Sequence, residues 1–296
     1  MKTKHVLSVL VGILIVFVII WVLYSRLYSK PESELKLMNQ NQRNHEVSVV
    51  FINAGRADSI LVQIDGHSFL IDTGLKSSAS KIKEVLNKYR VNKLDAVFLT
   101  HQHHDHIGGL KKIAKNYRID KIYAAKLSIR DENNQNKIDK TANKLNITLA
   151  TLVFSERVKL VEDVYMEVLG PIELNEKDDN DNSLVLRMFV NGRTFLFTGD
   201  MQFAEEKTLM DKKVDVSADV YKMSNHGNPD ATLKEFAKKV SPLHAIVTTD
   251  TKKDKDSANK MVLSFFDKSK IYLTQDYELG VLVTVNAAGK IKVKEA

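Results

Sequence analysis

The chain has 296 residues, of which 44% are hydrophobic and 27% charged, a composition typical of a globular protein with a sizeable core. It contains no cysteine, which excludes disulfides and thiolate metal ligands. The formal net charge is +7, but residues 1–44 contribute +4 of it. The nearly balanced remainder does not indicate a general polyanion-binding surface.

The N-terminal segment has the pattern of a membrane anchor. Val6–Tyr24 is an apolar run interrupted only by Ser8 and Gly12. A helix of that length spans about 30 Å, close to the hydrocarbon core of a bilayer. No small-x-small cleavage site follows Trp21. We therefore predict an uncleaved anchor at residues 1–28 rather than a cleaved signal peptide, a polar linker at 29–45, and a domain outside the cytoplasm at 46–296.

Hydrophobic patterning predicts an α+β fold with two packed sheets and outer helices. In the first half, strands are predicted at Glu46–Asn53, Asp58–Ile64, Ser68–Asp72, Leu94–Leu99, Ile119–Ala124 and Val164–Leu169, and helices at Ser80–Tyr89 and Lys126–Leu145. In the second half, strands are predicted at Ser183–Val190, Thr194–Phe197, Val220–Met223, Ala245–Thr249, Ile271–Thr274, Val281–Val285 and Ile291–Val293, and helices at Phe203–Met210, Thr232–Val240 and Ser257–Phe266. Turns are expected at Asp65-Gly66, Asn191-Gly192 and Ala288-Gly289.

The most distinctive motif is Thr-His-Gln-His-His-Asp-His at residues 100–106, which holds four of the nine histidines. Residues two apart at a strand end point the same way, so His101 and His103 can bind one ion. Asp105 and His106 can face a second ion once the chain turns. Imidazole and carboxylate suit zinc, manganese or iron, and two such ions can share a hydroxide that hydrolyses esters and phosphodiesters.

Two distant segments offer further ligands. Asp200 follows a predicted strand in Phe-Thr-Gly-Asp and could bridge two ions through its two oxygens, or simply cap a turn. His226 follows another predicted strand in Asn-His-Gly. Considered alone, it could equally be a structural histidine.

Taken together, His-x-His-x-Asp-His, Thr-Gly-Asp and His-Gly resemble the metal-binding motifs of the metallo-β-lactamase superfamily. Segments at 53–59, 71–74, 180–186 and 241–242 resemble the branch that includes the hydrolase domain of the DNA-uptake protein ComEC and the phosphorylcholine esterases. The resemblance covers roughly residues 46–293 and implies a four-layer αββα sandwich with two divalent ions at one edge, Zn²⁺ foremost and Mn²⁺ as the alternative.

The resemblance also implies a role for individual residues. His101 and His103 would hold the first ion, Asp105, His106 and His226 the second, and Asp200 would bridge them. Asp105 and Asp200 would be the catalytic residues. Asp72 would support the ligand loop by hydrogen bonding, and Asp58 would do similar work near the pocket floor. His104, His67 and His244 are not expected to be ligands.

Three departures from the family pattern matter. No histidine lies between residues 107 and 225, so Asn180 would have to complete the first site with an amide oxygen, a weaker ligand for zinc. Asn225 stands where the branch often has a histidine, which removes a proton donor. Arg56 replaces the usual Gln of Gly-Gln-Gly-Asp, and it could bind a substrate phosphate or remain solvated.

The resemblance therefore predicts a membrane-anchored, extracytoplasmic, metal-dependent hydrolase. The expected substrate is an anionic phosphodiester in nucleic acid or in a cell-surface polymer, and no obligate protein partner is evident. Two alternatives remain open: a hydrolase of lactones, carboxylic esters or lactams, and a metal-poor relative that only binds.

Overall fold

The computed structural model describes residues 44–296, and its strands form two large sheets and one small one. The first sheet contains β1 (Val47–Ile52), β2 (Ile60–Ile64), β3 (His67–Ile71), β5 (Ala96–Leu99), β7 (Ile122–Ala125), β8 (Leu149–Leu152), β16 (Gly280–Val285) and β17 (Ile291–Glu295). The second contains β9 (Arg157–Val161), β10 (Val164–Gly170), β11 (Val185–Val190), β12 (Arg193–Phe197), β13 (Val220–Lys222), β14 (His244–Val247) and β15 (Lys270–Leu273). The small sheet pairs β4 (Lys93–Leu94) with β6 (Arg118–Ile119).

Seven α-helices and three short 3₁₀ turns connect the strands of this part of the chain. The helices are α3 (Ala79–Lys88), α4 (His104–Ile107), α5 (Leu110–Ala114), α6 (Lys137–Leu145), α7 (Phe203–Asp211), α8 (Lys234–Val240) and α9 (Lys260–Ser264). The 3₁₀ turns are η1 (Asp179–Asn182), η2 (Ser224–Gly227) and η3 (Thr274–Asp276).

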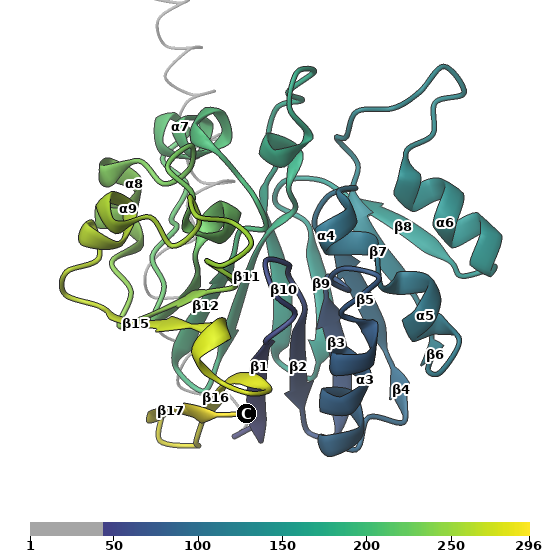
Figure 1. The fold of residues 1–296 in the computed structure, drawn as a ribbon, viewed down its shortest axis with the longest axis horizontal. Coiled ribbons are helices and arrows are strands. Elements are labelled where there is room, and N and C mark those ends of the chain that lie inside the picture. Colours follow the sequence, from purple (N-terminus) through teal and green to yellow (C-terminus); the bar gives the residue numbers. More distant parts are fainter. Residues whose placement is uncertain (1–43) are drawn as a thin grey trace, which may run out of the picture. The chain divides into compact units, whose positions relative to one another are not determined.

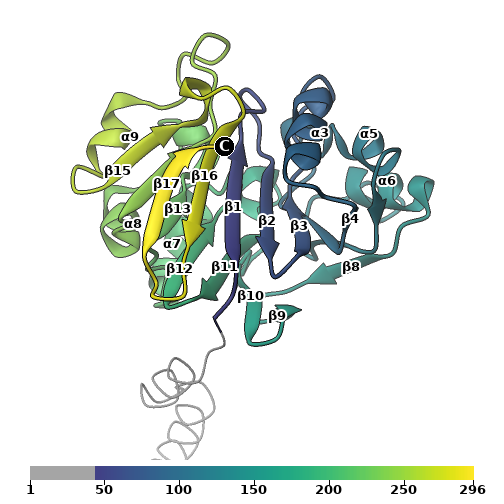
Figure 2. The same ribbon diagram turned by 90° about the horizontal axis from the view of Figure 1, so that it is seen from below.

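The two large sheets pack face to face, with helices on both outer faces (Figures 1 and 2). Alternate side chains of each sheet point into the space between them, where the rings of Phe51 and Phe197 lie 6.2 Å apart. Ile82 of α3 packs on the outer face of the first sheet, and Phe236 of α8 on that of the second. The predicted α+β class and αββα layering are confirmed.

Strand direction determines where the loops converge. In the first sheet β3, β5, β7 and β8 run parallel in that order, and in the second β12, β13, β14 and β15 do the same. The carboxyl ends of parallel neighbours meet at one sheet edge, which is where open α/β sheets place ligand sites. The predicted metal ligands follow β5, β12 and β13.

Several sequence-based expectations differ from the structure. The helix predicted at Lys126–Leu145 begins only at Lys137, because the Asn136 side chain accepts the Asp139 N–H in a capping box and so starts the helix there. The helix predicted at Ser257–Phe266 is likewise shortened to α9 by a cap at Asn259. Strands β8 and β9 were not predicted, because both are short and only partly buried.

The predicted anchor at 1–28 and nearly all of the linker at 29–45 lie outside the described residues. Within residues 44–296, no helix has the length and apolar character needed to cross a membrane.

Candidate metal centre

Four predicted ligands come together at the shared sheet edge. Their donor atoms lie within 4.8 Å of one another, and all four residues, Asp105, His106, Asp200 and His226, are buried. Asp105 and His106 lie on α4, Asp200 follows β12, and His226 lies on η2 after β13. Each half of the sandwich therefore contributes ligands to one position.

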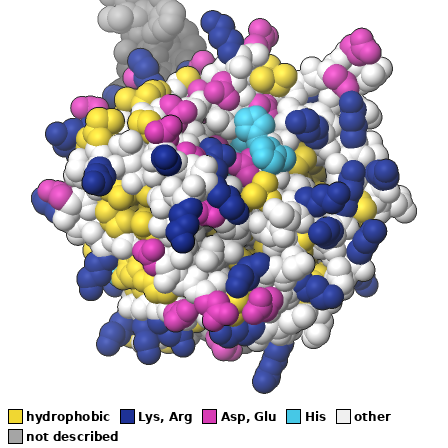
Figure 3. All heavy atoms as spheres, in the orientation of Figure 1, with side chains coloured by type: hydrophobic (Ala, Val, Ile, Leu, Met, Phe, Trp, Pro, Cys, Tyr) yellow, Lys and Arg dark blue, Asp and Glu magenta, His cyan; other side chains and the backbone are white. Residues whose placement is uncertain are grey.

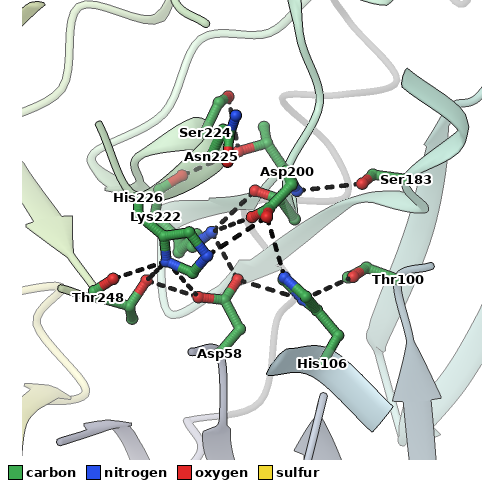
Figure 4. A network of polar contacts seen from close by, with 12 residues as sticks. Asp58, Thr100, His106, Ser183, Asp200, Lys222, Ser224, Asn225, His226 and Thr248 are labelled. Carbon is green, nitrogen blue, oxygen red and sulfur yellow. Dashed lines mark hydrogen bonds and ion pairs between the residues drawn. The ribbon is translucent and has the colours of Figure 1, made fainter. Parts of the chain in front are cut away.

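Asp200 is at the middle of this group. Its Oδ2 lies 3.1 Å from His106 Nε2 and 3.3 Å from His226 Nε2. His226 Nε2 also lies 3.6 Å from Asp105 Oδ2. Figure 4 shows both imidazoles pointing toward the Asp200 carboxylate.

The backbone around His226 adopts an unusual conformation. Both Asn225 and His226 have left-handed torsions, with φ of 40° and 55°. Such torsions at non-glycine residues cost on the order of 1–3 kcal/mol each and persist only where the surroundings impose them. Here the Asn225 N–H donates to Gly199 O and the Ala258 N–H donates to His226 O, so neighbouring loops hold the turn that directs the imidazole inward.

His106 is oriented by a carboxylate behind it. Its Nδ1 lies 2.8 Å from Asp72 Oδ2, and Asp72 in turn accepts hydrogen bonds from the backbone N–H and the hydroxyl of Thr100. His226 is held similarly, since its Nδ1 lies 2.7 Å from Thr248 O. In both rings the outer nitrogen is thereby engaged, and Nε2 is left for the site.

The donor set fits a divalent ion. The Nε2 atoms of His106 and His226 and the Oδ1 of Asp200 are buried, yet they form no hydrogen bond with any described residue. Buried polar atoms without partners are rare in folded proteins, and lone pairs directed at a bound cation account for them. Burial opposes ionisation of Asp200, but the neighbouring His106 and His226 hold its pKa well below its usual range, so this carboxylate is ionised.

The histidines predicted for a first ion are arranged differently. His101 Nε2 lies 3.0 Å from His103 Nδ1, and neither residue joins a group of three potential ligands within residues 44–296. His101 Nδ1 lies 3.3 Å from Ser183 Oγ, which accepts the Asp200 N–H. Asn180 lies on η1, and its side-chain oxygen is buried without a hydrogen-bond donor among the described residues. The structure thus brings the residues predicted for the second ion close together, whereas His101 and His103 lie outside that group.

A buried lysine, missed in the sequence, lies behind the ligands. Lys222 is fully buried, and its Nζ lies 2.5 Å from Asp58 Oδ2, 2.8 Å from Gly199 O and 3.6 Å from Asp200 Oδ1. Burial alone would lower the pKa of Lys222, but the carboxylates of Asp58 and Asp200 raise it, so the ammonium is charged. The available signal was a lysine ending the apolar strand β13, three residues before the Asn-His-Gly motif. Asp58 therefore neutralises Lys222, and it also lies 3.9 Å from His106 Nδ1 and 3.7 Å from His226 Nδ1, behind the two ligand imidazoles.

Arg56 lies at the outer side of the site. Its Nη1 donates to Asp105 Oδ2 at 2.6 Å and its Nε to Asp254 Oδ2 at 2.8 Å. The side chain remains 30% exposed, so the guanidinium is neither simply solvated nor buried.

The remaining histidines are not part of the ligand group. The His104 side chain is 83% exposed, His67 lies beside Asp95 on the far end of β3, and His244 begins β14.

The αββα sandwich and the Asp and His residues at its edge define a class of metal-binding proteins. The chain belongs to the Metallo-beta-lactamase superfamily, whose family model matches residues 52–262. The resemblance noted in the sequence is thereby confirmed.

Relatives and solved structures agree with this assignment. The chain is 24% identical over 255 residues to ComE operon protein 3 of Bacillus subtilis, covering 80% of this chain and 33% of that protein. It is 28% identical over 207 residues to Competence protein ComA of Neisseria gonorrhoeae, covering 69% of this chain and 27% of that protein. The chain thus spans a third or less of the length of these relatives.

Two solved structures share the fold. One is the metallo-beta-lactamase fold protein YhfI from Bacillus subtilis, with a TM-score of 0.55 and 13% identity, covering 85% of this chain and all of that one. The other is CmlA, a diiron beta-hydroxylase from Streptomyces venezuelae, with a TM-score of 0.51 and 11% identity, covering 78% of this chain and 53% of that one.

Proposed function

We propose that this chain is a metal-dependent phosphodiesterase that acts on nucleic acid or on a cell-surface phosphodiester polymer. The observation that carries the proposal is the buried group of Asp105, His106, Asp200 and His226, with two imidazole nitrogens directed into it. Similarity to two competence proteins supports the choice of a phosphodiester over a lactone, carboxylic ester or lactam.

Asp105, His106, Asp200 and His226 would hold one divalent ion firmly, zinc foremost and manganese as the alternative. His101 and His103, helped by the amide oxygen of Asn180, would hold a second ion more weakly. Bound ions would polarise a phosphoryl oxygen and lower the pKa of water at the site.

The protein's own residues would orient the reaction. Asp72 and Thr248 hold the outer nitrogens of His106 and His226, so both Nε2 donors would stay directed at the site as the substrate binds. Asp105 lies beside the half-exposed Arg56 and is the ligand nearest to solvent, where it would orient the attacking water. Arg56 has no hydrogen bond from Nη2 to any described residue, and this group would bind a phosphate oxygen of the substrate.

Metal uptake and turnover test the proposal together. The full-length chain is loaded with zinc or manganese, dialysed, and assayed for bound metal and for hydrolysis of bis-p-nitrophenyl phosphate. We expect tight uptake that His226→Ala abolishes, while His67→Ala, an exposed histidine outside the site, leaves it unchanged. Absence of uptake would favour a metal-poor binding protein, and turnover of nitrocefin or a lactone alone would favour the other hydrolase class.

We further propose that residues 1–28 anchor the chain in the cell membrane with residues 46–296 outside the cytoplasm. The apolar run Val6–Tyr24 supports this. Protease treatment of intact cells should degrade the domain while the chain stays in the membrane fraction after alkaline extraction. Protection of the domain would contradict the orientation.

A further inference from the structure

Positive charge is concentrated in one layer of the molecule. Residues 75–145 contain sixteen lysines and arginines but only seven aspartates and glutamates, a surplus of nine. The whole chain has a net charge of +7, so all other residues together carry −2. This segment includes α3, α5 and α6, which cover the outer face of the first sheet. The nearly balanced charge of the domain therefore conceals a strongly basic face.

The basic layer begins beside the candidate metal centre. Lys76, His104 and Lys112 line a hollow of about 500 Å³, together with Leu75, Ser77 and Gly108. His104 directly precedes the predicted ligand Asp105. Gly108 allows this close packing, because a Cβ there would lie 2.8 Å from Lys76 N. Figure 3 shows dark-blue side chains on the side of α5 and α6, next to the cyan histidines.

Several cations of this layer lack an ion pair with any described residue, and four of these line the hollow or belong to α5 and its C-cap. Lys76, Lys111, Lys112 and Lys115 are exposed and form no ion pair with any residue of 44–296. Some other lysines of the layer are neutralised, since Lys93 pairs with Asp95 and Asp120, and Lys140 pairs with Asp131. The four are close in sequence or line the same hollow, so their mutual repulsion would be relieved by a ligand with several negative charges.

We propose that Lys76, Lys111, Lys112 and Lys115 form a docking strip for a linear phosphodiester polymer and lead one of its phosphodiesters into the metal centre. The proposal rests on the phosphodiesterase function proposed above and makes the substrate a polymer rather than a small ester. Lysine binds phosphate as a point charge without demanding a particular geometry. The strip would therefore bind the charged phosphodiester backbone of the polymer and would not distinguish the groups attached to it.

Salt dependence gives the strip a quantitative signature. Each phosphate neutralised on a single strand contributes about −0.7 to the slope of log affinity against log salt, so four contacts give about −3. Replacing the three lysines of the α5 region should reduce the slope to about −1 and weaken binding by at least about tenfold at low salt.

The test is fluorescence anisotropy of a labelled oligothymidylate on the full-length chain in EDTA, where no turnover occurs. Lys111→Gln/Lys112→Gln/Lys115→Gln is compared with Lys290→Gln/Lys292→Gln/Lys294→Gln, which removes the same charge from the exposed β17 hairpin. We expect loss of affinity only in the first variant, and displacement of the oligonucleotide by unlabelled poly(glycerol phosphate).

Equal affinities of the two variants would overturn the strip, as would binding to phosphatidylglycerol vesicles without binding to the oligonucleotide. Failure of poly(glycerol phosphate) to compete would contradict the claim that the strip binds the phosphodiester backbone alone. Strip-dependent binding by a protein that hydrolyses no phosphodiester would instead overturn the proposed function and leave the strip intact.

Discussion

Asp72 Oδ2 lies 2.8 Å from His106 Nδ1, and this contact decides which nitrogen of the imidazole faces the other candidate ligands. Asp72 is itself held by the backbone N–H and the hydroxyl of Thr100, the residue that ends the strand before the histidine motif. The loop that carries Asp72 thus determines which nitrogen of His106 is presented to the metal centre.

Asp72→Asn should therefore weaken metal binding by about 10- to 100-fold, because the ring loses the carboxylate that fixes its tautomer and orientation. Isothermal titration of the metal-free protein with zinc measures the effect. Asp95→Asn, which removes a carboxylate from the surface pair with Lys93, is the matched control. Unchanged affinity in Asp72→Asn would show that His106 needs no such support.

Lys222→Met should lower the free energy of unfolding by about 3–5 kcal/mol, because it leaves the buried Asp58 carboxylate without its cation. Adding Asp58→Asn should restore part of the loss, since neither charge then remains. Urea denaturation of the metal-free variants measures both. A double variant no more stable than Lys222→Met would contradict a compensating pair.

Arg56→Gln should reduce kcat/KM for phosphodiesters by about 10- to 100-fold, the value of one charge-assisted hydrogen bond to substrate. Metal content should stay close to that of the unaltered protein, because Arg56 contacts Asp105 without being a ligand. Steady-state kinetics with metal analysis separates the two effects. If Arg56→Gln lowers the metal content but leaves kcat/KM per bound ion unchanged, Arg56 only positions Asp105.

Glu206 is buried at the start of α7 and accepts hydrogen bonds from the N–H groups of Thr232 and Leu233. Burial raises the pKa of Glu206 from 4.5 to about 8. Because the folded-state pKa is the higher one, its stabilising effect is complete below pH 4.5 and is lost as the pH rises toward 8. The loss is about 1.4 kcal/mol per pH unit in that window.

Glu206→Gln keeps an acceptor but cannot titrate, so its stability should vary less between these pH values than that of the unaltered protein. Thermal unfolding followed across the window measures the difference. The exposed Glu235→Gln should show the unaltered pH dependence. Parallel curves for all three proteins would mean that Glu206 is ionised in the fold.

Much of the fold was predictable because local patterns matched their tertiary surroundings. Most of the apolar run Leu94–Leu99 became β5, although Leu94 belongs to β4, and Val220–Met223 gave β13. Asp65-Gly66 became a hairpin turn with φ of 50° and 81°. Prediction failed where the pattern was weak. The predicted helix extended too far toward the N-terminus, through polar residues before Lys137, although the Asn136 cap starts the helix only there. The alternation of exposed and buried side chains in β9 is too short to predict a strand.

By itself, the sequence determined the chemistry available to this protein. Without cysteine it offers only imidazole, carboxylate and amide ligands, and the spacing of residues 101–106 concentrates them after one strand. Only the tertiary structure decided which of them meet. His106 and His226 converge on Asp200, whereas His101 and His103 face each other, because convergence depends on how parallel strands of two sheets bring their ends together across long sequence separations. The same holds for charge: the lysines of residues 75–145 become one basic face only when three helices cover one sheet beside the metal centre.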